Sequence, residues 1–205
     1  ACFSAKHPEA EFFLRAQPSN RVQESIASQQ IDLGFAEKPE KSDLYSAKNF
    51  ELMTVVALSR EHPLSHHDVL TPKDLDGVPF TTHLPDHHLT KSLQAAFDNN
   101  GSQLKVPYYL QNAASQYTIV ESGQAVGFMS LISVWIYRQL RNDVMDQRIV
   151  FRPFLPKIHQ TISLITPAHR PISQICQQFL IDFEDAIDDV IATTKQEFQY
   201  FNFDT

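Results

Sequence analysis

The chain has 205 residues, of which 42% are apolar and 20% are charged, and its formal net charge at pH 7 is −7. This length and apolar content are enough for one large core or two small ones. The acidic balance disfavours direct binding of duplex DNA, which normally requires a basic face. No apolar run approaches the ~20 residues of a membrane span. The amino-terminal stretch lacks the basic start and apolar core of a secretory signal, although earlier removal of a signal stays open.

The two cysteines, Cys2 and Cys176, lie far apart in the chain. Nothing in their spacing supports a disulfide, and the pattern favours reduced thiols in a cytoplasmic protein. The chain contains no CxxC, HExxH or Walker motif, and its five glycines form no phosphate-binding loop. The sequence therefore predicts no cofactor.

Strand-like apolar segments alternate with amphipathic, helix-like segments along the chain. The predicted strands cover 10–17, 31–36, 50–59, 78–84, 105–111, 125–132, 148–154 and 159–166. The predicted helices begin after Pro18 and at Thr71-Pro72, and then cover 89–101, 114–123, 134–141 and 172–196. This alternation predicts an α/β fold with mostly parallel sheets.

For three of the predicted helices, the sequence indicates a cap residue or an apolar face. Ser19 or Asn20 is expected to cap the first helix, because both side chains accept hydrogen bonds from free backbone N–H groups. The apolar faces of the helices repeat at helical spacing. They consist of Val22, Ile26 and Ala27; then Leu89, Leu93, Ala96 and Phe97; and then Ile175, Phe179, Phe183 and Ile187.

The strand pattern restarts after a polar, turn-rich loop at 60–77, which predicts two sheets. A central domain over 61–163 would interrupt a first domain formed by 1–60 and 164–205. The crossings near Ser59-Arg60 and Leu164-Ile165 would form a hinge. Ligands of open α/β folds bind beyond the carboxyl ends of strands, so we expect those ends to border one cleft.

The order of the motifs resembles the effector-binding domain of LysR-type transcriptional regulators. The matching pieces span residues 3 to about 190 and are FSAKHPEAEFFL, RVQESIASQQIDLGFA, TVVALSREHPLS, LTPKDLDGVPFTT, IVESGQAVGFMSL and QFLIDFEDAI. The resemblance implies a type 2 periplasmic-binding-protein fold, in which a two-strand hinge joins two Rossmann-like subdomains. It also implies that the family's DNA-binding domain, linker helix and first strand are not in this chain.

The same resemblance implies a homodimer or tetramer, with the helices after Ser19 and Leu89 as candidate faces. It implies a small-molecule effector, such as an organic acid or an amino acid, and contact with DNA only through the DNA-binding domain. It implies neither membrane association nor an enzyme. The alternative is an extracytoplasmic solute-binding protein of the same fold, because fold alone does not define function. A catalytic role ranks last, since no nucleophile–base pair stands out.

Candidate ligand residues of the first domain lie at strand and helix ends. The stretch IDLGFAEKP places Ala36 and Glu37 at the expected cleft edge, although Glu37 also fits a solvated loop acid. Gln17, Pro18 and Ser19 precede a helix whose free N–H groups attract anions. The alternative is that Ser19 only caps this helix.

Candidate residues of the central domain follow the same logic. Thr81, Thr82 and His83 end a strand, and alternation favours either Thr81 with His83 or the Thr82 hydroxyl with neighbouring amides. Further candidates are the polar end of the next strand and an apolar wall, namely Gln111, Asn112, Ala113, Phe128 and Met129. Exposed strand-end threonines and core packing of the aromatic residue and methionine are the alternatives.

A histidine-rich turn raises the question of a metal. Asp86, His87 and His88 lie close to His83, but their spacing matches no common zinc pattern. The neighbouring pair His66-His67 has even less support. We therefore predict no metal site.

Overall fold

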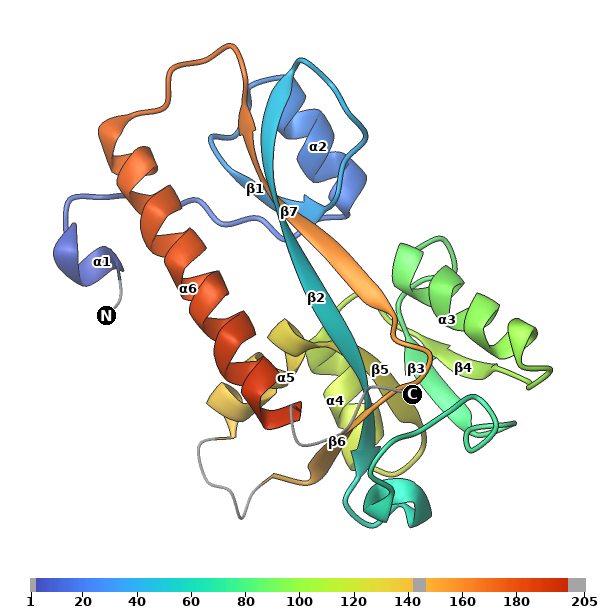
Figure 1. The fold of residues 1–205 in the computed structure, drawn as a ribbon. Helices are drawn as coiled ribbons and strands as arrows, with labels where there is room; N and C mark the ends of the chain where they lie inside the picture. The colour runs from blue at the N-terminus through green and yellow to red at the C-terminus, as the bar shows by residue number, and fades with distance from the viewer. Residues whose placement is uncertain (1–2, 142–146, 199–205) are drawn as a thin grey trace. The chain divides into compact units, whose positions relative to one another are not determined.

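The computed structural model describes residues 3–141 and 147–198, so any pairing of Cys2 lies outside the described residues. The chain forms two compact units (Figure 1). Unit 1 comprises Ala1–Glu51 and Thr161–Asp189, and unit 2 comprises Leu52–Gln160 and Val190–Thr205. The predicted hinge and its boundaries stay a prediction. None of the described helices is long and apolar enough to cross a membrane.

Unit 2 is built on a mixed sheet with the order β2-β5-β3-β4, in which β6 also pairs with β2. Its strands are β2 (Tyr45–Ser59, of which residues 52–59 lie in unit 2), β3 (Pro79–Thr82), β4 (Lys105–Tyr109), β5 (Val126–Ser130) and β6 (Ile149–Pro153). β3 runs parallel to β4 and β5, whereas β2 runs antiparallel to β5 and β6. The expected parallel pairing therefore holds only for β3 and the two strands that adjoin it, β4 and β5.

Helices cover both faces of this sheet. On one face, α3 (His88–Asn99) buries Leu89, Leu93, Ala96 and Phe97 against Phe80 and Phe128. This confirms the apolar face predicted for that helix. On the other face, α4 (Ala113–Glu121) and α5 (Leu131–Leu140) pack on the sheet through a second apolar cluster.

Unit 1 contains α1 (Phe3–Lys6), α2 (Ser19–Ala27) and β1 (Gly34–Glu37). β1 pairs antiparallel with β7 (His159–Pro167), which lies next to β2 in the strand order. The strand predicted at 31–36 is therefore shorter, shifted and not parallel. A side chain at Gly34 would bring its Cβ within 2.5 Å of Val22 Cγ1, so glycine lets α2 pack closely on β1. The long helix α6 (Gln174–Phe198) completes the chain's described elements.

The strand predicted at 10–17 is wrong. This segment is irregular, and its Phe13 and Leu14 side chains are 85% and 90% exposed. An apolar segment becomes a strand only when a neighbouring strand pairs with its backbone. No strand pairs with these residues in the structure, so the apolar pattern alone gave a wrong strand prediction.

Two local predictions about helix starts are also wrong. Pro18 occupies the cap position of α2, and no side chain caps that helix. The Ser19 hydroxyl instead accepts a hydrogen bond from the Glu37 N–H at 3.2 Å. The helix predicted at Thr71-Pro72 is a turn, in which the Asp74 carboxylate accepts hydrogen bonds from both the backbone N–H and the hydroxyl of Thr71.

Two histidines act as helix caps through an unprotonated ring nitrogen. His87 Nδ1 accepts a hydrogen bond from the Leu89 N–H at the start of α3, and His62 Nδ1 does the same for Leu64 at the start of η1 (Pro63–His66). Burial lowers the pKa of both imidazoles below the ordinary 6.5, and His88 lowers that of His87 further. Both caps require the neutral ring.

Acidification is therefore expected to destabilise the protein through these caps. Because the folded-state pKa is lower than that of the unfolded chain, this stabilisation is complete above about pH 6.5 and is lost as the pH falls through the folded pKa. The variant His87→Asn keeps an acceptor at the cap but does not titrate. Chemical denaturation from neutral pH to about pH 5 should show a weaker pH dependence for His87→Asn than for wild type. An unchanged pH dependence would contradict the assignment.

Candidate functional site

The carboxyl ends of three parallel strands meet at one edge of the unit 2 sheet. β3 ends at Thr82, β4 at Tyr109 and β5 at Ser130. Thr81 and Thr82 are both fully buried. The Thr82 hydroxyl lies 3.3 Å from the Thr90 hydroxyl, which donates to the His83 carbonyl at 3.0 Å. The predicted threonines are therefore buried parts of the strand end, not exposed surface residues.

The predicted residues after β4 lie at the start of α4. Gln111 and Asn112 are exposed, and Ala113 is the first helical residue. Asn112 Oδ1 accepts a hydrogen bond from the Ser115 N–H at 2.9 Å and so caps the helix. The first N–H groups of a helix have no intrahelical acceptor and carry partial positive charge. This end of α4 can therefore favour an anionic or hydroxyl oxygen.

Phe128 and Met129 project from β5 into the two apolar clusters on opposite faces of the unit 2 sheet. Phe128 packs with the cluster on the α3 side and contacts the Phe154 ring edge-on at 5.2 Å. Met129 belongs to the cluster on the α4 side. Their burial agrees with the core-packing alternative. After the end of β3, His83 stacks on His87, with ring centroids 4.2 Å apart.

The predicted residues of unit 1 gather around the end of β1. Two residues of α2 hold Glu37 in place. The Glu37 backbone N–H donates to the Ser19 hydroxyl, and the Glu37 carbonyl accepts from the Gln23 side chain at 3.2 Å. Ala36 is buried against α2. Pro18 starts that helix, and the Gln17 amide reaches the Ser25 hydroxyl at 3.5 Å. The stretch IDLGFAEKP thus contains β1, and hydrogen bonds from α2 hold the end of this strand in place.

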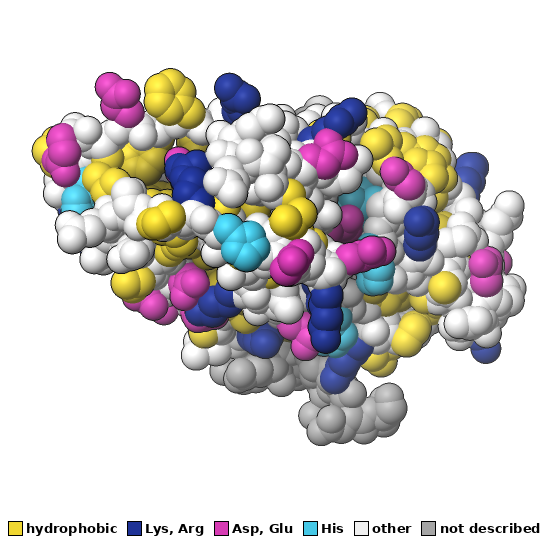
Figure 2. All heavy atoms as spheres, turned by 90° about the horizontal axis from the view of Figure 1, so that it is seen from above, with side chains coloured by type: hydrophobic (Ala, Val, Ile, Leu, Met, Phe, Trp, Pro, Cys, Tyr) yellow, Lys and Arg dark blue, Asp and Glu magenta, His cyan; other side chains and the backbone are white. Residues whose placement is uncertain are grey.

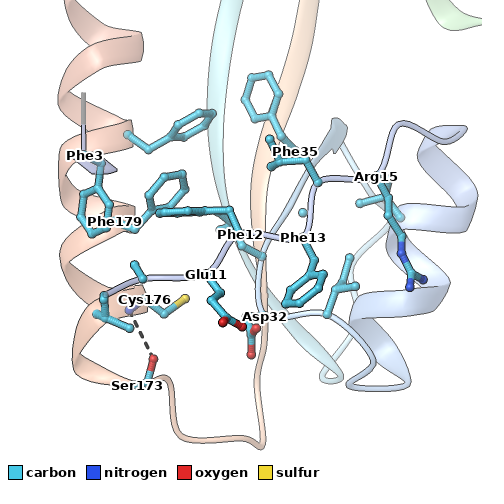
Figure 3. Close-up of a pocket in the computed structure, with 18 of the residues that line it drawn as sticks. Phe3, Glu11, Phe12, Phe13, Arg15, Asp32, Phe35, Ser173, Cys176 and Phe179 are labelled. Atoms are coloured by element: carbon cyan, nitrogen blue, oxygen red, sulfur yellow. Dashed lines mark hydrogen bonds between the residues drawn. The ribbon is translucent and has the colours of Figure 1, made fainter. Parts of the chain in front are cut away.

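Unit 1 also contains an apolar groove of about 580 Å³ (Figure 3). Its walls come from the irregular segment around Phe12, the stretch ending in Phe35, and the start of α6 around Phe179. Phe12 contacts Phe179 with ring centroids 5.6 Å apart. Gln17 is the one predicted ligand residue that lines this groove. This groove was not predictable from the sequence, because the segments that form its walls are far apart in the chain.

A few polar groups border the groove. Asp32 pairs with Arg170, and Ser173 accepts a hydrogen bond from the Cys176 N–H at 3.3 Å. Burial raises the pKa of the Cys176 thiol, and Asp32 raises it further, so the thiol stays protonated at neutral pH. Most of the other side chains that line the groove are apolar, so the groove is suited to apolar contact.

Residues that could hold a metal do not converge in the part of the chain that the structure describes, since no group of three or more His, Cys, Asp or Glu is suitably placed. On the face shown in Figure 2, acidic and basic side chains are interspersed with apolar ones, and no continuous basic surface is seen.

Together, the two units define the class of α/β domains with the type 2 periplasmic-binding-protein-like fold. The model of the family described as LysR substrate binding domain matches residues 1–185, so the chain belongs to that family.

The relatives and solved structures agree with this assignment. The chain is 26% identical over 183 residues to the transcriptional activator protein LysR of Escherichia coli K12, covering 86% of this chain and 55% of that protein. It is 24% identical over 178 residues to the HTH-type transcriptional regulator YvbU of Bacillus subtilis 168, covering 87% and 58%. The chain therefore spans little more than half the length of these relatives.

Two solved structures have the same fold. The CcmR regulatory domain of Synechocystis PCC6803 in complex with 2-PG has a TM-score of 0.70 at 18% identity, covering 94% of this chain and 88% of that one. The effector-binding domain of QuiR in complex with shikimate has a TM-score of 0.66 at 16% identity, covering 95% and 87%.

Proposed function

We propose that this domain senses a small polar organic molecule on behalf of a LysR-type transcriptional regulator in the cytoplasm. The observation that carries the proposal is the strand-end edge of unit 2, where β3 ends in Thr81 and Thr82 and α4 begins with the Asn112 amide and free backbone N–H groups. Hydroxyl and amide groups fix the orientation of small ligands in such folds.

The expected effector is a small organic acid or an amino acid. The side chains of this edge are uncharged hydroxyls and amides, and the start of α4 supplies partial positive charge for a carboxylate. Shikimate, which is bound to the QuiR domain, is an acid that also carries hydroxyl groups. In unit 1, Gln17, Pro18, Ser19, Ala36 and Glu37 are proposed as further effector contacts.

Control of transcription is proposed to act through the full-length protein. Effector binding changes the equilibrium between two arrangements of the domain only if the effector has different affinities for them. The full-length protein is proposed to be a homodimer or tetramer that contacts DNA through its DNA-binding domain. The exposed faces of α2 and α3 are the proposed self-association surfaces.

The test is transcription in vitro by the full-length protein, from a promoter that it binds, with and without a compound that stabilises residues 1–205. The proposal expects the compound to change the transcript yield. A compound that binds tightly and leaves the yield unchanged would instead favour a role in solute delivery.

A further inference from the structure

Two buried polar atoms, one on β3 and one on α4, have no hydrogen-bond partner among the described residues. They are Thr81 Oγ1, on a residue that is 0% exposed, and Gln116 Oε1, on a residue that is 1% exposed. Leaving such an atom buried and unpaired is costly, so native proteins rarely do so without a reason. We infer that Thr81 and Gln116 bind a hydroxyl group of the effector, an inference that rests on the proposed function.

The strand register places Thr81 on the face of the sheet that α4 covers. Phe80 and Thr82 contact Phe97 and Thr90 of α3, so the intervening Thr81 points to the opposite face. Thr81 also pairs with Gly127 of β5. The Thr81 side chain therefore lies next to Gly127, on the face of the sheet that α4 covers.

Gly127 locates the part of α4 that lies above Thr81. A Cβ at Gly127 would lie 3.1 Å from Val120 Cγ2, so Val120 contacts the sheet at this point. Gln116 is one turn nearer the start of α4, on the same side of the helix as Val120. Gln116 is thus placed on the strand-end side of Thr81, where the effector is proposed to bind.

The chemistry of the pair selects the ligand group. A threonine hydroxyl donates and accepts, and a glutamine amide offers both an acceptor and donors. A ligand hydroxyl also donates and accepts, so it complements both side chains at once. A carboxylate only accepts, and it cannot satisfy Gln116 Oε1. We therefore assign to this pair the discrimination of hydroxy acids from their deoxy analogues.

Unfolding measurements on the ligand-free protein provide the first test. Thr54 is buried like Thr81, but its hydroxyl donates to the Ile158 carbonyl at 2.7 Å. The variant Thr54→Val should therefore lower the folding equilibrium constant by roughly fivefold, whereas Thr81→Val should cause no measurable loss. An equal loss in both variants would show that structure alone already satisfies Thr81 and would overturn the inference.

Nuclear magnetic resonance of the labelled 1–205 protein provides the second test. The probes are three hydroxy acids and their deoxy partners, namely glycolate and acetate, lactate and propionate, and malate and succinate. At least one hydroxy acid should shift the Gln116 side-chain amide signals more than its partner does, and Thr81→Val should remove that difference. The affinity of the protein for that hydroxy acid should fall about tenfold in Thr81→Val.

The outcomes separate the two proposals. Shifts at the backbone amides that begin α4, without any shift at the Gln116 side chain, would overturn the inference and leave the proposed function standing. The absence of shifts for all six probes would count against both proposals. A conservative variant, Thr81→Ser, should restore the preference for the hydroxy acid.

Discussion

Replacing Phe97 with alanine is expected to lower the free energy of unfolding by about 3–5 kcal/mol. Phe97 is fully buried in unit 2, where its ring contacts Phe80 edge-on at 5.6 Å and stacks on Phe154 at 6.3 Å. Truncation removes both aromatic contacts and leaves a cavity that α3 and the sheet close only in part. Denaturant titration followed by circular dichroism measures the loss.

The matched control for this change is Phe13→Ala. Phe13 is 85% exposed, so its truncation should change the free energy of unfolding by less than about 0.5 kcal/mol. Similar losses in the two variants would contradict the burial described for unit 2.

The second large effect is expected at Tyr137, whose hydroxyl joins three elements of unit 2. This hydroxyl accepts hydrogen bonds from the Arg148 and Ile149 N–H groups at 3.0 and 3.2 Å, and it donates to Glu121 Oε1 at 3.0 Å. Burial raises the pKa of Tyr137, so the hydroxyl remains protonated. The variant Tyr137→Phe leaves the buried Ile149 N–H unpaired and should cost about 1–3 kcal/mol.

Tyr108→Phe is the appropriate comparison, because the Tyr108 hydroxyl makes one exposed hydrogen bond to Gln124 at 3.1 Å. Its loss should change the free energy of unfolding by no more than about 0.5 kcal/mol. If Tyr137→Phe proved as mild as Tyr108→Phe, the hydrogen-bond junction would have no role in holding β6 to α4 and α5.

Helical periodicity was the most dependable part of the sequence. The apolar positions predicted for α3 are all buried, and the helix ends at Asn99, with Asn100 as its cap, before Gly101, which has a positive φ of 64°. These features depend on local spacing and on backbone conformations that glycine favours. The alternation of helices and strands likewise predicted the fold class.

Features that depend on distant partners were not predictable. The segment 10–17 has the composition of a strand, yet it is irregular, because strand formation depends on a pairing that the segment itself does not encode. Ser19 is a residue type that commonly caps helices, but its hydroxyl accepts a hydrogen bond from the backbone N–H of Glu37, 18 residues away. Histidine caps were missed because the capping preference favours Ser, Thr, Asp and Asn.

The candidate site was predictable only in outline. Strand ends carrying Thr81, Thr82 and Asn112 were recognisable because ligands of open α/β folds bind beyond such ends. Gln116 was missed because it lies inside a helix, and only the folded chain shows that its side chain is buried. The groove in unit 1 was missed because Phe12, Phe35 and Phe179 meet only in the folded chain.

The most direct test of an effector-binding domain is the unfolding midpoint of residues 1–205 measured against a panel of small organic acids, hydroxy acids and amino acids. We expect at least one compound to raise the midpoint in a saturable manner, adding about 2.7 kcal/mol of stability at 100 times its Kd. The same compound should raise the midpoint of Phe13→Ala by a similar amount. If no member of these classes raised the midpoint, and a full-length protein bound to its promoter were equally insensitive to them, the account would be contradicted.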